Sequence, residues 1–461
     1  MSYSFNPQIH LKRLSDALLY LEAGKVTKSM GMVFEAHLPG ASVGSICKVV
    51  THPGAEPIEA EVVGFRDRRV VLMPFDDATG VNNDSRVILH RRGSAVRVSS
   101  ALLGRVINAR GEPIDGKGPI LHHEAGRVLE RSLYEKPSHP MERSLVREPV
   151  DLGIRAIDGM LTVGKGQRVG VMAGSGVGKS VLLGMMAKNT SADINVIALI
   201  GERGREVREF IEKDLGPEGL QRSVIIVATS DQSPLLRMRG AFLAASIAEF
   251  FRDEAKDVLL LMDSITRFCM AQREIGLSMG EPPASKGYTP SVFSTLPKLL
   301  ERAGTGIGKG SITGLYTVLV EGDDMDDPIA DLSRSILDGH IVLSRKIAQR
   351  NHFPAIDVLQ SASRVFRSVT QKPHQEWAGK IREWMALYAQ AEDLINIGAY
   401  AKGANNKVDQ AVEVADRIQA FLRQGMEDRC SAADTQAMMH AICRAGDAVA
   451  QTTAAQNTGR G

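Results

Sequence analysis

The pattern of apolar and polar positions divides the chain into stretches of different character. Residues 9–22 carry leucines at helical spacing on one face and charges on the other, which predicts a short amphipathic helix. Periodicity alone leaves open whether this helix caps its own domain or docks on a partner. From 25 to 99 the pattern becomes short β-type runs such as "SICKVV" and "RVVLMPF", separated by Gly, Pro, Asn and Asp. Strands this short and numerous predict a small β-barrel or sandwich.

After a Gly- and Pro-punctuated connecting segment, 100–145, apolar runs alternate with helical patterns over 146–370. The runs are "RVGVMA", "NVIALIG", "SVIIVA", "VLLLMD", "ITGLYTVLV" and "HIVLS". Strands that are apolar throughout are typical of a parallel sheet covered by helices, so this stretch is predicted to be an α/β domain. The periodicity over 371–450 predicts an α-helical domain, and the polar stretch 451–461 is expected to be a disordered tail.

Composition narrows the function classes. The 461 residues hold 56 Lys and Arg against 54 Asp and Glu, so overall charge gives no reason to expect nucleic acid as a partner. The four cysteines have neither disulfide-framework nor metal-ligand spacing and are expected to be buried thiols in a reducing compartment. The sequence shows neither a secretory leader nor an apolar run long enough for a membrane span, and we therefore expect a cytoplasmic protein.

The stretch "VMAGSGVGKS" follows an apolar strand and precedes a helical pattern. Glycines in such a loop turn backbone N–H groups inward at the positive end of a helix dipole, which makes a cradle for polyphosphate. Lys179 can reach the outer phosphates, and the Ser180 hydroxyl can bind the accompanying Mg²⁺. Ala173 replaces the first glycine of the usual pattern, a small change in size. The predicted nucleotide-binding residues of this loop are Ala173, Gly174, Ser175, Gly176, Val177, Gly178, Lys179, Ser180 and Val181.

Two acidic residues follow predicted strands and are expected to face the phosphates, because ligands of open α/β sheets bind beyond the carboxyl ends of the strands. Asp263 ends "VLLLMD" and is predicted to hold Mg²⁺ through a water molecule, with helix capping as the alternative. Glu202 opens "ERGREVRE" and can orient and deprotonate a water molecule, although such charged clusters are usually solvated. Composition does not distinguish Glu202 from Glu206.

Several motifs occur in order across roughly residues 25–425. They are "AGSGVGKS", "LIGERGRE", "LLLMDSITRF", "GEPPASKGYTPSVFSTLPKLLERAG" and "ILDGHIVLSRKIAQRNHFPAIDVLQSASRV". Together they resemble the catalytic subunits of rotary ATPases, and most closely the flagellum-specific and type III secretion export ATPases. The resemblance implies a multidomain chain with a small N-terminal β-barrel, a central RecA-like P-loop domain and a C-terminal helical domain. It also implies a homohexameric ring that hydrolyses ATP with Mg²⁺.

The resemblance also assigns roles to individual residues. Glu202 matches the water-activating carboxylate, which favours it over Glu206. Arg364, in "SASRV", matches the arginine finger that reaches the γ-phosphate of a neighbouring subunit, a role suited to a guanidinium because phosphoryl transfer builds charge on oxygen. Phe353 matches an aromatic residue that stacks on adenine, with plain core packing as the alternative. Arg203 is either a supporting interface charge or part of an ordinary salt bridge.

Family resemblance further implies partners and a role in export. Residues 1–24 match the place where export ATPases bind a dimeric regulator, which favours the docking interpretation of the helix. A coiled-coil central stalk, a membrane export gate and chaperone–substrate complexes complete the expected partners of a ring at the inner face of the cell membrane. Flagellar export is the leading hypothesis and a non-flagellar injectisome the alternative. A non-catalytic nucleotide-binding subunit and a Rho-like RNA translocase are the remaining candidates.

Overall fold

The N-terminal part of the molecule is a closed β-barrel. The computed structural model describes residues 22–458 except 125, 321, 323, 325 and 402, so the predicted N-terminal helix lies outside the described residues. The barrel has the strand order β1-β2-β5-β4-β3-β6 and encloses an apolar core. Its strands are β1 Ala23–Met30, β2 Val33–His37, β3 Ile46–Val50, β4 Ile58–Arg66, β5 Arg69–Pro74 and β6 Arg86–Arg91. The barrel alternative is thereby confirmed.

The segment expected to connect the two domains contributes strands of its own. β7 (Ala95–Val98) pairs with β9 (Leu129–Ser132) as a two-stranded ribbon. Between them, β8 (Arg105–Asn108) pairs in parallel with β12 at the edge of the central sheet. The chain therefore enters the central domain before the predicted boundary and returns to the ribbon.

The central domain is built on a sheet of nine strands within the described residues, with the main order β17-β16-β10-β15-β13-β11-β12-β8. The six predicted strands are present as β10 Arg168–Ala173, β11 Ile194–Ile200, β12 Ser223–Ala228, β13 Asp257–Asp263, β15 Ser311–Leu319 and β16 Gly339–Leu343. β14 (Gly304–Thr305) and β17 (Ile356–Ser363) join them as antiparallel strands. The predicted parallel α/β core is confirmed.

Helices cover this sheet and seal two apolar clusters, one on each face. The principal ones are α3 Lys179–Asn189, α6 Pro234–Asp253, α7 Ile265–Ser278 and α8 Pro290–Leu300. Shorter ones are α2 Arg155–Met160, α4 Gly204–Glu209, α5 Gly216–Gln221, α9 Pro328–Ile336, α10 Arg345–Gln349 and α11 Phe366–Val369. A π-helical turn, Phe210–Leu215, joins α4 to α5.

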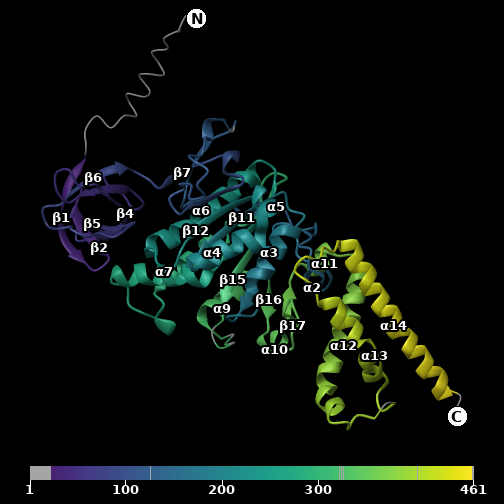
Figure 1. The fold of residues 1–461 in the computed structure, drawn as a ribbon. Helices are drawn as coiled ribbons and strands as arrows, with labels where there is room; N and C mark the ends of the chain where they lie inside the picture. The colour runs from purple at the N-terminus through teal and green to yellow at the C-terminus, as the bar shows by residue number, and fades with distance from the viewer. Residues whose placement is uncertain are drawn as a thin grey trace, which may run out of the picture.

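The C-terminal part is helical, as expected, and lies on the opposite side of the central domain from the barrel (Figure 1). It consists of α12 Lys372–Asn396, α13 Asn406–Leu422 and α14 Ala432–Thr458. α14 continues through 451–458, where a disordered tail was expected, and ends at Thr458. Residues 459–461 lie outside the described residues.

Buried polar contacts join the parts of the molecule. Glu61 of the barrel forms an ion pair of 3.1 Å with Arg239 of α6, and both side chains are 3% exposed. Tyr134 donates its hydroxyl to the same carboxylate at 2.8 Å. Elsewhere, the buried carboxylate of Asp158 accepts hydrogen bonds from the backbone N–H groups of Leu152 and Ile154, which fixes the start of the central domain against α2.

Among the described helices, none has both the length and the apolar character required to cross a membrane.

Candidate nucleotide-binding site

The glycine-rich loop connects the end of a central strand to the start of a helix. β10 ends at Ala173, which is paired on both sides, with Leu319 of β15 and Leu343 of β16. Gly176 and Gly178 have φ of 77° and 87°, a left-handed conformation that glycine adopts without strain. Because the N-cap residue Gly178 has no side chain, no capping group covers the first amides of α3, which can bind an anion.

Two carboxylates and the loop lysine meet at the carboxyl edge of the sheet. The parallel register pairs Leu199 of β11 with Asp263 of β13, which brings the ends of these strands together. Lys179 Nζ lies 2.5 Å from Asp263 Oδ1 and 3.4 Å from Glu202 Oε1. Glu206, the other candidate acid, instead pairs with Arg203 at 3.1 Å, an exposed i,i+3 contact. The structure therefore places Glu202, rather than Glu206, against the lysine.

Burial and charge set the protonation of this group. Burial, reinforced by the negative charge of Asp263, raises the pKa of Glu202 to about 7, and Lys179 partly opposes this shift. Burial alone lowers the pKa of Lys179, but the two carboxylates outweigh it and the net shift is upward. Lys179 therefore remains an ammonium, whose single positive charge offsets one of the two carboxylate charges.

The oxygen donors fit Mg²⁺. Asp263 offers a carboxylate, and Ser180, the residue after Lys179, offers an exposed hydroxyl; oxygen is the ligand type that Mg²⁺ prefers. Within the described part of the chain, no group of three or more His, Cys, Asp or Glu residues could hold a metal by itself. In the Mg²⁺ sites of nucleotide enzymes, one or two protein oxygens usually act together with phosphates and water.

One polar residue at the site was not identified from the sequence. Thr317 on β15 donates its hydroxyl to Asp263 Oδ1 at 2.6 Å, and its side chain is fully buried. The available signal was a hydroxyl residue within the otherwise apolar run "ITGLYTVLV". Without the strand order, nothing in the sequence connects it to Asp263.

Phe353 lies beside the end of the glycine loop that leads into α3. A Cβ atom built on Gly178 would be 3.5 Å from the ring of Phe353, which is 42% exposed and so has a free surface beside the loop. The backbone N–H of Gln424 donates to the Phe353 carbonyl at 2.9 Å. The buried amide of Gln424 also accepts the Arg155 N–H and donates to the Gly153 carbonyl, so this residue ties the helical domain to the nucleotide site.

Arg364 does not join the lysine and the two carboxylates in the same chain. β17 runs antiparallel to β16, with Ile356 opposite Leu343 at the loop edge and Ser363 opposite Gly339 at the far edge. Arg364 follows directly and donates to the Arg334 carbonyl at 3.1 Å. The exposed guanidinium therefore lies at the edge of the sheet away from its own glycine loop.

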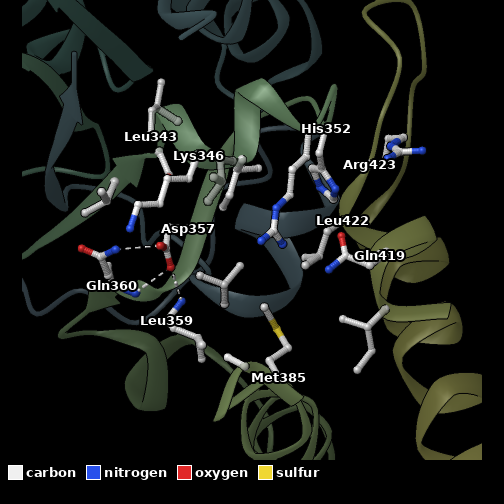
Figure 2. A pocket seen from close by; sticks show the side chains of 18 of the residues that line it. Leu343, Lys346, His352, Asp357, Leu359, Gln360, Met385, Gln419, Leu422 and Arg423 are labelled. Atoms are coloured by element: carbon white, nitrogen blue, oxygen red, sulfur yellow. Dashed lines mark hydrogen bonds between the residues drawn. The ribbon is translucent and has the colours of Figure 1, made fainter. Parts of the chain in front are cut away.

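A large cavity of about 920 Å³ adjoins the site between the central and helical domains. Figure 2 shows Lys346, Asp357 and Gln360 along one wall, with Leu422 and Gln419 of the C-terminal region opposite and Met385 below. Asp357 accepts the N–H groups of Leu359 and Gln360, so its charge is already satisfied. The first two loop residues, Ala173 and Gly174, line the cavity, whereas Lys179, Glu202 and Asp263 are not among the described residues that line it. The cavity therefore neighbours the phosphate site without containing it.

Comparison with known families agrees with this arrangement. Residues 153–363 match the family model of the ATP synthase alpha/beta family, nucleotide-binding domain. Residues 370–441 match the model of the T3SS EscN ATPase C-terminal domain. The two matches together cover the central domain and most of the helical domain.

Similar proteins span nearly the whole chain. A flagellum-specific ATP synthase of Bacillus subtilis is 51% identical over 89% of this chain and 92% of its own length. A type 3 secretion system ATPase of Sinorhizobium fredii is 47% identical over 88% of each chain. The structure of the assembled ATPase EscN from the enteropathogenic E. coli type III secretion system superposes with a TM-score of 0.85 at 45% identity, covering 91% of this chain and 99% of that one. A structure of EscN in complex with its central stalk EscO has a TM-score of 0.83.

Proposed function

The chain belongs to the ATP synthase alpha/beta family, among its flagellum-specific and type III secretion ATPases, and is an ATPase; from this premise we propose that it works as a Mg²⁺-dependent homohexameric ring that energises flagellar protein export. Chaperone release, substrate unfolding and delivery to the export gate are the steps that hydrolysis drives. The observation that carries the catalytic part is the meeting of Lys179, Glu202 and Asp263 at one edge of the sheet.

The residues divide the chemistry among them. The loop amides and Lys179 bind the phosphates, and the ammonium exchanges its carboxylate partners for phosphate oxygens. Ser180 and Asp263 hold Mg²⁺, Asp263 through water; when bound, the ion neutralises charge on the phosphate oxygens. Glu202 accepts a hydrogen bond from the attacking water and takes its proton, because phosphoryl transfer needs an oriented nucleophile. Phe353 offers its exposed ring to the adenine.

A ring completes each site. Arg364 lies at the sheet edge remote from its own glycine loop, so as an arginine finger it acts on the nucleotide of a neighbouring protomer. The similarity to the assembled EscN supports self-association, and the complex of EscN with EscO supports a coiled-coil stalk in the central pore. Because one chain carries both the glycine loop and Arg364, identical subunits suffice for every site.

The remaining partners follow from the flagellar assignment. We propose that residues 1–24 dock on a regulator dimer and that the ring associates peripherally with the inner face of the cell membrane, from the cytoplasm, at the export gate. Chaperone–substrate complexes are its cargo, and nucleic acid is not a partner. An injectisome ATPase is the alternative, supported by the similarity to the Sinorhizobium fredii protein. Loss of motility and hook assembly in a deletion strain supports the flagellar role, whereas unchanged motility with lost effector secretion supports the alternative.

The non-catalytic alternative is addressed by exchanging one carboxylate. We expect Glu202→Gln to bind ATP with unchanged affinity and to release no phosphate, because the amide cannot accept the proton. Glu206→Gln is the matched control and should retain most of the hydrolysis, since Glu206 pairs with Arg203 and contacts Glu202 but does not pair with the lysine. Binding is measured with a fluorescent nucleotide and turnover by phosphate release. Undiminished turnover of Glu202→Gln would contradict the catalytic assignment, and ATP binding without turnover in the wild-type ring would support a scaffold.

A further inference from the structure

Asp263 receives two donors on the same carboxylate oxygen. Lys179 Nζ lies 2.5 Å from Oδ1, and the Thr317 hydroxyl donates to Oδ1 at 2.6 Å. An O–H···O⁻ distance of this length is typical of a charge-assisted hydrogen bond. Both donors are therefore concentrated on Oδ1, and Oδ2 is the oxygen of Asp263 that neither of them occupies.

The hydroxyl of Thr317 is held rigidly. Thr317 lies on β15, which is paired in parallel with β10 on one side and with β13 on the other. Tyr316 is opposite Met262 in the register, which places the next residue of each strand, Thr317 and Asp263, at the same level of the sheet. A fully buried β-branched side chain on a central strand has little rotational freedom. Thr317 is therefore the more restricted of the two donors to Asp263.

The two donors differ in what nucleotide binding does to them. Lys179 is a flexible side chain whose proposed function requires it to leave Asp263 for the phosphates. Thr317 has no such alternative, since its second contact, with the Met262 carbonyl at 3.4 Å, belongs to the same strand as Asp263. After the lysine moves, the threonine hydroxyl is the donor that still holds Oδ1.

We propose that Thr317 is a positioning residue for the Mg²⁺ site, and that its hydroxyl fixes the Asp263 carboxylate so that Oδ2 faces the metal-bound water throughout the ATPase cycle. This inference rests on the proposed function, in which Asp263 holds Mg²⁺ through water. Groups that orient a metal-binding carboxylate typically change metal affinity by about 10- to 100-fold when removed.

Thr317→Val tests the proposal, because valine keeps the shape and removes the hydroxyl. Mn²⁺ serves as the probe, and electron paramagnetic resonance of free Mn²⁺ measures its binding to the full-length protein saturated with ADP. We expect the Mn²⁺ dissociation constant to rise by about 10-fold or more. The Mg²⁺ concentration for half-maximal ATP hydrolysis should shift in the same direction. Thr317→Ser retains the hydroxyl and should bind Mn²⁺ within about 2-fold of wild type.

Two controls separate positioning from packing. Thr313→Val removes a buried hydroxyl from the same strand, one that accepts the Gly166 N–H, and should leave Mn²⁺ binding unchanged. Thr317→Ser and Thr317→Ala both lack the γ-methyl and differ only in the hydroxyl, so this pair decides the question if the valine variant does not fold. A packing role predicts that serine is impaired and valine is not, and that result would overturn the proposal. If wild-type protein with ADP binds no Mn²⁺, the proposed Mg²⁺ site itself is wrong; if it does and Thr317→Val binds equally well, only the role of Thr317 is wrong.

Discussion

Arg364 offers the most decisive test of the ring. Ser363 lies opposite Gly339, four residues along β16 from Leu343, so at about 3.3 Å per residue Arg364, the next residue, lies roughly 16 Å along the strand direction from the loop edge of the sheet. One arginine side chain cannot span this distance. We therefore expect an Arg364→Ala chain to be inactive by itself, although its own glycine loop and Glu202 are intact, and a Lys179→Ala chain to be inactive although it still presents Arg364.

Mixing the two variants should restore activity. An active interface needs an intact loop from the Arg364→Ala chain and an intact finger from a Lys179→Ala neighbour. In randomly mixed rings of equal proportions, about a quarter of the interfaces meet this condition, so we expect about a quarter of wild-type turnover if the sites act independently. Each variant alone should retain less than about a thousandth, since an arginine finger contributes about 10³- to 10⁵-fold.

The assay is phosphate release over a series of mixing ratios, with mixed rings verified by mass photometry of a size-tagged chain. Activity should be greatest at equal proportions and should fall toward both ends. The control mixes Arg364→Ala with a chain carrying both substitutions, which supplies no finger and should restore nothing. Verified mixed rings without recovery at any ratio, or substantial turnover by Arg364→Ala alone, would refute the reasoning.

Three further changes test contacts elsewhere in the chain. Glu61→Ala leaves the buried charge of Arg239 unpaired and should lower the free energy of unfolding by about 3–5 kcal/mol in urea titrations. The control, Glu59→Ala, breaks the more exposed pair with Arg110 on the same strand and should lower it by about 1 kcal/mol or less. Burial raises the pKa of Asp158 from 3.8 to about 7, so the folded state binds the carboxyl proton more tightly than the unfolded state does. The free energy of unfolding should therefore fall as the pH rises from about 4 to about 7. Asp158→Asn should remove this part of the pH dependence, measured by urea titrations at each pH. Gln424→Ala keeps the backbone N–H that donates to Phe353 but removes the side-chain amide bonds to Arg155 and Gly153 that anchor this segment. KM for ATP should therefore rise several-fold with kcat little changed, and an unchanged KM would contradict this coupling.

Local patterns in the sequence account for much of the site. The glycines and Lys179 occur within ten residues, and a strand–loop–helix pattern suffices to predict a phosphate cradle because its geometry is local. Asp263 and Glu202 were predicted to face the phosphates because both follow apolar strands of a parallel sheet. The choice between Glu202 and Glu206 is different in kind, since it depends on which carboxylate reaches Lys179, and the contacts of the folded chain favour Glu202.

Long-range pairing decided the rest. Thr317 is far from Asp263 in the chain, and the strand order alone makes them neighbours. An extra antiparallel strand, β17, carries Arg364 to the far edge of the sheet, which its sequence could not indicate because strand direction depends on the partner strand. The sequence by itself determined the elements, the cradle and the acids that follow the strands, since these depend on neighbouring residues. The tertiary structure decided which donors hold Asp263 and which protomer Arg364 can serve, because hydrogen bonds between distant segments exist only once the sheet has formed.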